Sequence, residues 1–393
     1  MMETFFILGL IIIIGFIALY IYERYNIPQV LLLITLGFII GPVLKFADTS
    51  PNSVISQLYP YISTLALILL LFDGGISLNI YNVFSALSKS LIYTFVTFIL
   101  SILLSTLALV FTMHIPIIHA LLIGTALAGI SSAIVISIVE KLKTNEDTKT
   151  LLTIESVLND SLVIIAIFIL LQYAANPSLK YGALINKLIS SFSIATLFGG
   201  IAAFLYNLFL KKLKNFKYEY MLTLSVLFIL YSLTEWVDAN GGLAVFVFGL
   251  VFGNLKNIPS YILSSKYKAD DEKIRDFQYE ITFFIRTFFF TYIGLLYPLS
   301  ALNIYTFGIS LFLVVVYLIS RYLSYKIVLS NEKEKYDVKY IASICPRGLA
   351  AAVVVGLIVQ ASINIPYLYA IVFNTIFLTN VLSTIFVYKL TPQ

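Results

Sequence analysis

The sequence contains few charged residues, one cysteine and only two histidines. Charged residues make up 11% of its 393 positions, whereas a soluble globular protein has about 25%. The lone Cys345 excludes a disulfide within the chain and any cysteine-based metal cluster. No polar stretch is long enough to form a soluble domain, so a soluble catalytic or nucleotide-binding domain is not expected.

Long apolar runs dominate the sequence instead. Hydrophobic residues make up 60% of it, and runs of about 20 apolar residues, the length of a membrane-spanning helix, recur along the chain. We therefore predict an all-α polytopic membrane protein, a single transmembrane domain over residues 1–393 with about thirteen transmembrane helices. The predicted spans are 3–22, 27–44, 58–79, 88–112, 116–139, 149–173, 183–210, 218–236, 240–255, 274–298, 302–325, 338–360 and 365–388.

The lysines and arginines between the spans predict the orientation. Loops after odd-numbered spans contain 18 of these residues, and loops after even-numbered spans contain three, Lys45, Lys180 and Lys187. Positive charge accumulates in cytoplasmic loops, so we predict an outside N-terminus and a cytoplasmic C-terminus. Because the basic residues sit in short loops, the formal charge of +5 does not indicate nucleic-acid binding.

The odd number of spans permits two inverted halves. Spans 1–6 and 8–13 would form two six-helix repeats, and span seven, as the link, would place them in opposite orientation, as in many secondary transporters. Span five contains ALAGISSAIVISIV (126–139) and span twelve contains ICPRGLAAAVVVGLIV (344–359), each with small and polar residues near its middle. Such paired interruptions indicate broken helices at a binding site. The alternative is that glycine and serine simply allow close helix packing.

Six ionisable side chains fall inside the predicted spans. Each costs roughly 3 kcal/mol to insert into the membrane, so a function or a partner is expected to retain it. They are three acids and three bases, Asp73, Glu155, Asp160, Arg286, Arg321 and Arg347. Structural pairing alone is an alternative explanation for any one of them.

Span six carries two acids that point in different directions. In the segment IESVLND (154–160), Glu155 and Asn159 share one face of the helix, and Ser156 and Asp160 share the neighbouring face. Glu155 and Asp160 are about 140° apart around the helix axis. This geometry suggests that one acid is held in an ion pair while the other faces a hydrated cavity.

A carboxylate that faces such a cavity can exchange ligands. A hard cation prefers oxygen ligands, which Asp160, Ser156 and a facing carboxylate such as Asp73 would supply. Removal from bulk water raises the pKa of a carboxyl group toward the physiological range. The same group can then hold either a proton or a cation, and this competition is the minimum requirement of an antiporter.

Motifs in six spans carry a family resemblance. The pattern E-S-x-x-N-D occurs at 155–160, and the others are LGFIIGP (36–42), LLFDGGISL (70–78), FFFTYIGL (288–295), SRYLS (320–324) and PRGLAAAV (346–353). In this order they resemble the cation/proton antiporter superfamily, closest to the NhaP-like and NHE-like sodium/proton antiporters. Singly only E-S-x-x-N-D is specific, but together the motifs cover the chain from span two to span twelve.

The resemblance implies the organisation of a secondary active transporter and not of an enzyme. A transport core of spans 3–6 and 10–13 would move against a dimerisation scaffold of spans 1–2 and 7–9, in elevator-like alternating access. Spans five and twelve would be unwound and would cross near the midplane. The implied partners are a monovalent cation, a proton, the lipid bilayer and a second copy of the chain, with no cofactor, in the cell membrane of a prokaryote.

The resemblance also implies the roles of individual residues. Asp160 would be the main carboxylate that exchanges a cation for a proton, with Asp73 and Ser156 as further ligands of Na⁺. Glu155 would pair with Arg321. Asn159 would stabilise the crossing without adding a charge, which implies electroneutral exchange. Arg347 would offset helix-end dipoles at the break in span twelve, and Arg286 matches no family residue.

One departure from the family pattern bears on selectivity. The NhaP-like pattern in span five is Thr-Asp-Pro, with the aspartate as a cation ligand, whereas here Ser131, Ser132 and Ala133 occupy these positions. The Ser-Ser pair resembles the potassium-efflux Kef-like branch, so K⁺/H⁺ exchange is the alternative to Na⁺/H⁺ exchange. A sodium-coupled organic-solute transporter and a membrane enzyme or sensor are weaker alternatives, because the sequence shows no further polar cavity groups and no phosphate-binding loop.

Overall fold

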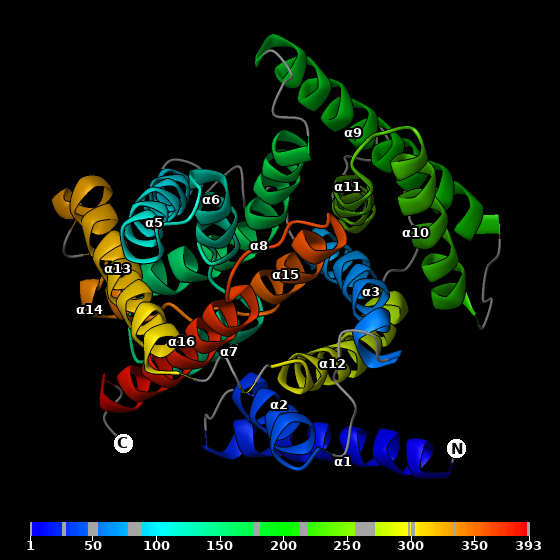
Figure 1. The fold of residues 1–393 in the computed structure, drawn as a ribbon. Coiled ribbons are helices and arrows are strands. Elements are labelled where there is room, and N and C mark those ends of the chain that lie inside the picture. Colours follow the sequence, from blue (N-terminus) through cyan, green and yellow to red (C-terminus); the bar gives the residue numbers. More distant parts are fainter. Residues whose placement is uncertain are drawn as a thin grey trace. The chain divides into compact units, whose positions relative to one another are not determined.

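The computed structural model describes residues 2–25, 29–45, 54–77, 89–175, 181–212, 218–255, 272–297, 299, 303–332 and 335–390. Apart from short turns and helix breaks, these residues are helical (Figure 1). The helices are α1 (Met2–Tyr25), α2 (Gln29–Phe38), a π-helical turn η1 (Ile39–Val43), α3 (Val54–Ser77), α5 (Lys89–Met113), α6 (Ile117–Ala126), α7 (Ser132–Lys141), α8 (Glu146–Ala175), α9 (Tyr181–Lys212), α10 (Glu219–Trp236), α11 (Gly241–Asn254), α12 (Glu272–Leu295), α13 (Ile304–Val328), a 3₁₀ turn η5 (Ser330–Glu332), α14 (Val338–Ser343), α15 (Leu349–Gln360) and α16 (Leu368–Leu390).

The predicted spans match these helices. Each of the thirteen spans coincides, within the described residues, with one helix or with two consecutive ones. Among the residues that the structure describes, five segments are long and apolar enough to cross a membrane on their own: α5, most of α8, α13, and the parts of α9 and α16 at Ile189–Leu210 and Leu368–Phe386. The all-α polytopic fold class is therefore confirmed.

The two predicted interruptions are helix breaks. Span five divides into α6 and α7, and span twelve divides into α14 and α15. Each break lies in the fifth span of its six-helix repeat. The break that the small and polar residues predict is confirmed in both halves of the chain.

The chain divides into two compact units. Unit 1 comprises Met1–Thr64, Ala86–Leu171 and Arg286–Gln393, and unit 2 comprises Leu65–Ser85 and Gln172–Ile285. Both broken helices, α5, α13, α16 and most of α8 belong to unit 1. The division into a transport core and a dimerisation scaffold stays a prediction.

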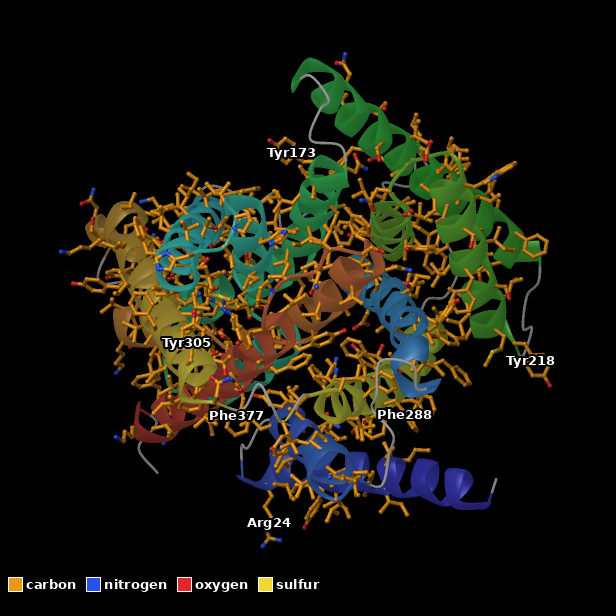
Figure 2. The ribbon with its side chains drawn as sticks, viewed as in Figure 1. Arg24, Tyr173, Tyr218, Phe288, Tyr305 and Phe377 are labelled. Carbon is orange, nitrogen blue, oxygen red and sulfur yellow. The ribbon has the colours of Figure 1, made fainter. Side chains whose placement is uncertain are left out.

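The interior of unit 1 is built around α6 and α15. Residues Ala352–Val355 of α15 are fully buried, so this helix is enclosed by protein. By contrast α13 keeps one apolar face exposed, including Leu311, Val315 and Ile319, as expected for a helix with one face toward lipid. At one end of α13 the hydroxyl of Tyr305 donates to the carbonyl oxygen of Thr112 on α5 (Figure 2).

A polar seam holds α5 to α13 within unit 1. The buried face of α5 presents Ser90, Thr94, Thr97, Ser101 and Ser105 at helical spacing. The hydroxyls of Ser101 and Ser320 are 3.0 Å apart. Small polar side chains allow two helices to approach closely and to hydrogen-bond inside a membrane, so this seam positions α13 against the interior of the unit.

Unit 2 is packed through glycines on α9 and α11. A Cβ added at Gly199 would lie 2.3 Å from the carbonyl oxygen of Ala244, and one at Gly249 would lie 2.7 Å from that of Phe72. Buried Gln278 of α12 donates to the carbonyl oxygen of Leu69 on α3 at 3.0 Å and accepts from the Tyr220 hydroxyl of α10 at 2.8 Å. Backbone contact at glycine therefore sets the spacing of α3, α9 and α11, and the hydrogen bonds of Gln278 join α12 to α3 and α10.

Candidate cation-binding site

The two helix breaks meet in unit 1. The chain leaves helical geometry between Ala126 and Ser132 and again between Ser343 and Leu349. A break inside a membrane exposes backbone groups that need partners. The backbone N–H of Ser131 in the first break donates to the carbonyl oxygen of Pro346 in the second, at 2.9 Å. This hydrogen bond therefore satisfies one exposed backbone group in each of the two breaks.

The crossing leaves no room for larger residues. A Cβ added at Gly348 would lie 2.3 Å from the Ser131 hydroxyl oxygen, and one at Gly129 would lie 2.6 Å from a methyl carbon of Val163 on α8. Ser131 is itself 4% exposed. Gly129 and Gly348 therefore permit the close approach that the crossing requires.

Arg347 occupies the second break. Its side chain is 1% exposed, and its Nη1 donates to the carbonyl oxygen of Gly129 at 2.9 Å. Its guanidinium lies 4.2 Å from the centre of the Tyr317 ring, which is within range of a cation–π interaction. The charge therefore lies beside a carbonyl in the break between α6 and α7, the kind of position that the resemblance implies for it.

A polar stripe on α16 supports this break and was missed in the sequence. Thr379 accepts from the backbone N–H of Arg347 at 3.1 Å, and Asn380 donates to the Arg347 carbonyl oxygen at 2.7 Å. Ser383 accepts from the N–H of Cys345 at 3.2 Å. The signal was the spacing of Thr375, Thr379 and Ser383, four residues apart inside an apolar helix.

Glu155 and Arg321 form a bidentate ion pair. Nη1 of Arg321 lies 2.6 Å from Oε1 of Glu155, and Nη2 lies 2.9 Å from Oε2. The two side chains are 0% and 1% exposed. Nε of Arg321 donates to the carbonyl oxygen of Ile341 on α14 at 2.7 Å. One guanidinium thus joins α8, α13 and the first half of the broken span twelve.

The carboxylate of Asp160 lies at the N-terminus of α7. Its Oδ2 accepts from the backbone N–H of Ser132 at 3.1 Å and from the Ser132 hydroxyl at 2.5 Å. The positive end of the helix dipole and free N–H groups favour an anion at this position. The residue that replaces the family's aspartate therefore holds Asp160 directly.

The other predicted site residues have different surroundings. The hydroxyl of Ser156 donates to the carbonyl oxygen of Thr153 in its own helix, at 2.9 Å. Asn159 is 1% exposed, and neither its amide nitrogen nor its amide oxygen has a hydrogen-bond partner among the described residues. A Cβ added at Gly129 would lie 3.4 Å from the Asn159 Cβ, so Asn159 lies beside the first break. Asp73 belongs to unit 2, on α3, and its participation stays a prediction.

Arg286 is the base that sequence reasoning left unassigned. It lies in the part of α12 that belongs to unit 1, and its guanidinium interacts electrostatically with the carboxylate of Asp160. The signal in the sequence was a positive charge inside an apolar span, because a base at membrane depth is expected to pair with an acid. Arg286 is therefore part of the electrostatic surroundings of Asp160.

The resulting arrangement is suited to a hard cation or a proton. Among the described residues no three His, Cys, Asp or Glu side chains gather in a metal-binding group. Within unit 1 the site instead combines the single carboxylate of Asp160 with the neutral oxygen of Ser132. Zinc and other transition metals prefer several nitrogen, sulfur or carboxylate ligands, whereas a carboxylate with neutral oxygens suits a hard cation.

Comparison with known proteins gives a family match over almost the whole chain. The family profile described as "Sodium/hydrogen exchanger, transmembrane" matches residues 9–389. Two relatives come from Methanocaldococcus jannaschii. The probable Na(+)/H(+) antiporter 2 is 26% identical over 71% of this chain and 66% of its own length, and Na(+)/H(+) antiporter 1 is 25% identical over 89% and 82%. The K(+)/H(+) antiporter NhaP of Alkalimonas amylolytica is 23% identical over 64% of this chain and 44% of its own.

A solved structure shares the fold. The sodium proton antiporter MjNhaP1 of Methanocaldococcus jannaschii superposes with a TM-score of 0.82 over 99% of each chain, at 23% sequence identity. The thirteen-span arrangement with broken fifth and twelfth spans is therefore that of a known polytopic membrane fold.

Proposed function

The chain belongs to the transmembrane sodium/hydrogen exchanger family, and from this premise we propose that it exchanges sodium ions for protons across a membrane through Asp160. The observation that carries the proposal is the position of the Asp160 carboxylate at the N-terminus of α7, beside the crossing of the two breaks. A carboxylate placed there can release a proton, bind a cation and return to its hydrogen bonds with Ser132 when it is empty. The two Methanocaldococcus jannaschii relatives with sodium/proton antiporter names support the choice of ions.

The charge count of the site favours electroneutral exchange. Asn159 occupies the position beside Asp160 without a charge, and Glu155 is committed to its ion pair with Arg321. One sodium ion that replaces one proton on Asp160 moves no net charge, and Asp73 does not alter this balance because only Asp160 exchanges its ligand. Asp73 and the hydroxyls of Ser131, Ser132 and Ser156 are the further ligands that this proposal assigns to the cation.

The proposal extends to the setting in which the exchange occurs. The core would carry the site between the two membrane faces in elevator-like alternating access, against a scaffold that forms a homodimer. The protein would reside in the cell membrane of a prokaryote, with an outside N-terminus and a cytoplasmic C-terminus. The asymmetric distribution of lysine and arginine among the loops supports this orientation.

A cation panel in proteoliposomes tests the proposed function. We expect external Na⁺ or Li⁺ to drive protons out of acid-loaded vesicles, measured with a pH-sensitive dye inside them, and K⁺ to do so more weakly. The exchange is expected to be unaffected by an imposed membrane potential, because it moves no net charge. Proton movement equal to that of protein-free vesicles for all three cations would contradict antiport altogether.

Potassium is the second candidate cation. The observation in its favour is that Ser131 and Ser132 replace the acid of the NhaP-like pattern, since fewer carboxylates weaken the hold on a small, strongly hydrated ion. In the same panel, strong responses to K⁺ and absent responses to Na⁺ would establish this alternative. The potassium/proton antiporter among the relatives supports testing it.

Replacing Ser132 by aspartate is expected to raise the affinity for sodium. The new carboxylate would lie beside Asp160, where the Ser132 hydroxyl now lies, and two adjacent carboxylates favour a bound cation or a shared proton. We expect the Na⁺ concentration for half-maximal exchange at alkaline pH to fall by about tenfold, or 1.4 kcal/mol. Ser132→Asn, of the same size but uncharged, is the matched control and should not lower it. An unchanged or raised half-maximal concentration in Ser132→Asp would contradict a cation site between these two residues.

A further inference from the structure

A surface cavity lies in unit 1, outside the proposed cation site. It has a volume of about 530 Å³ and lies where α13 ends, against the chain segments that lead into α8 and α14. Tyr322, Tyr325, Lys326 and Tyr336 line it together with Asn145 and Asp337. The distribution of lysine and arginine predicts that this end of the helices faces the cytoplasm.

Within the part of the chain that the structure describes, no ion pair neutralises the basic group of this cavity, Lys326. The neighbouring lysines form ion pairs, Lys89 with Glu332, Lys149 with Glu146 and Lys339 with Asp337. Among the described residues Lys326 has no such partner, and its ammonium lies 5.6 Å from the centre of the Tyr322 ring. The carboxylate of Asp337, which also lines the cavity, lies 3.5 Å from the Lys339 ammonium. The cavity therefore combines a positive charge with the hydroxyls of Tyr322 and Tyr336, which can donate to an anion.

The same end of α13 borders the lipid. Ile319, Leu323 and Ile327 are exposed at 48%, 37% and 64%, and their spacing of four residues places them in one stripe along the helix. Tyr322 and Lys326 are each one residue before a member of this stripe and are exposed as well. Tyrosine and lysine are typical of the level at which lipid headgroups begin. The cavity with its lysine and tyrosines therefore adjoins an apolar stripe that can contact acyl chains.

From this juxtaposition we propose that the cavity binds the headgroup of an anionic phospholipid. The Lys326 ammonium and the tyrosine hydroxyls hold the phosphate, and the acyl chains lie along Ile319, Leu323 and Ile327. A basic pocket between helices on the cytoplasmic side is the kind of site that recognises anionic headgroups. A freely soluble phosphate ester would satisfy the polar half of the site and leave the apolar stripe unused.

The site would link the two broken helices to the membrane surface. Asn145, whose side-chain oxygen accepts from the N–H of Thr148, lies in the connection between α7 and α8. Asp337, whose N–H donates to the Thr148 hydroxyl at 2.9 Å, is the residue before α14. A lipid seated between them and α13 holds both connections in place, so binding is expected to stabilise the folded protein.

Native mass spectrometry of the purified full-length protein tests this proposal. The protein is incubated in mild detergent with phosphatidylglycerol or with zwitterionic phosphatidylcholine of the same chain length. We expect the wild type to retain phosphatidylglycerol preferentially and Lys326→Gln to retain about fivefold less, since one lysine near the surface contributes this much to anionic lipid binding. Lys326→Arg keeps the charge and should retain the lipid. Phosphatidylglycerol should raise the unfolding temperature of the wild type and not that of Lys326→Gln.

Lys389→Gln is the matched control, because Lys389 is an exposed basic residue in the last turn of α16 and does not line the cavity. It should retain phosphatidylglycerol like the wild type. Equal losses in the two glutamine variants would overturn the proposal, because they would indicate attraction to the surface charge in general. Equal retention of the two lipids by the wild type would also overturn it. Stabilisation by glycerol 1-phosphate as large as that by the lipid would overturn the lipid assignment.

Discussion

Replacing Asp160 by asparagine is expected to abolish cation/proton exchange, with at least a hundredfold loss down to the leak of protein-free vesicles. Asparagine can still accept hydrogen bonds from Ser132, so the helix N-terminus keeps its partner. It cannot take up or release a proton in the physiological range, and it carries no charge to balance a cation. The measurement is dye-reported proton movement in proteoliposomes driven by Na⁺, Li⁺ and K⁺ in turn.

A second acid on the same helix provides the matched control for Asp160→Asn. Glu146 lies in the first turn of α8, where its side chain is 85% exposed and pairs with Lys149. Glu146→Gln removes the same charge from the same helix, and we expect its exchange rate to stay within a factor of two of the wild type, since exposed ion pairs contribute little. Exchange that persists in Asp160→Asn, or that fails equally in Glu146→Gln, would show that Asp160 is not the exchanging group.

Replacing Glu155 by glutamine is expected to destabilise the fold severely. The change leaves the guanidinium of Arg321 buried without its countercharge, and loss of one partner of a buried pair costs about 3–5 kcal/mol. Glutamine can still accept one hydrogen bond from Arg321, but it cannot balance the positive charge. Arg321 also joins α13 to α14 through its bond to the Ile341 carbonyl oxygen, so the change affects this helix contact as well. We expect the thermal unfolding midpoint of the purified protein in detergent to fall by several degrees.

A more exposed ion pair and a double variant make this test specific. Glu332→Gln removes the partner of Lys89, whose side chain is 38% exposed, and should change the free energy of unfolding by less than about 1 kcal/mol. Glu155→Gln combined with Arg321→Met removes both charges and should recover part of the loss, because no uncompensated charge is then buried. Equal midpoints for Glu155→Gln and Glu332→Gln, or simple additivity in the double variant, would show that the pair does not contribute as a buried unit.

The sequence by itself determined the spans, the two helix breaks and the directions of Glu155 and Asp160 on α8. These features are local. A chain in lipid must satisfy its backbone hydrogen bonds within each helix, so apolar length reports the spans, and helical spacing places Glu155 and Asp160 on different faces. Small and polar residues inside apolar runs marked both helix breaks, because they depart from the continuous apolar pattern of an unbroken span.

Only the tertiary structure decided which atoms meet at the site. The sequence placed Ser156 beside Asp160 on one helix face, but the Ser156 hydroxyl bonds to its own helix, and Ser132, 28 residues away in the chain, holds the carboxylate. The support of Arg347 by α16 is likewise a contact between distant segments, and the electrostatic interaction of Arg286 with Asp160 also joins residues far apart in the chain. Helical spacing gives the direction of a side chain and not its partner, since a hydrogen bond depends on differences of a few tenths of an ångström that are set by packing.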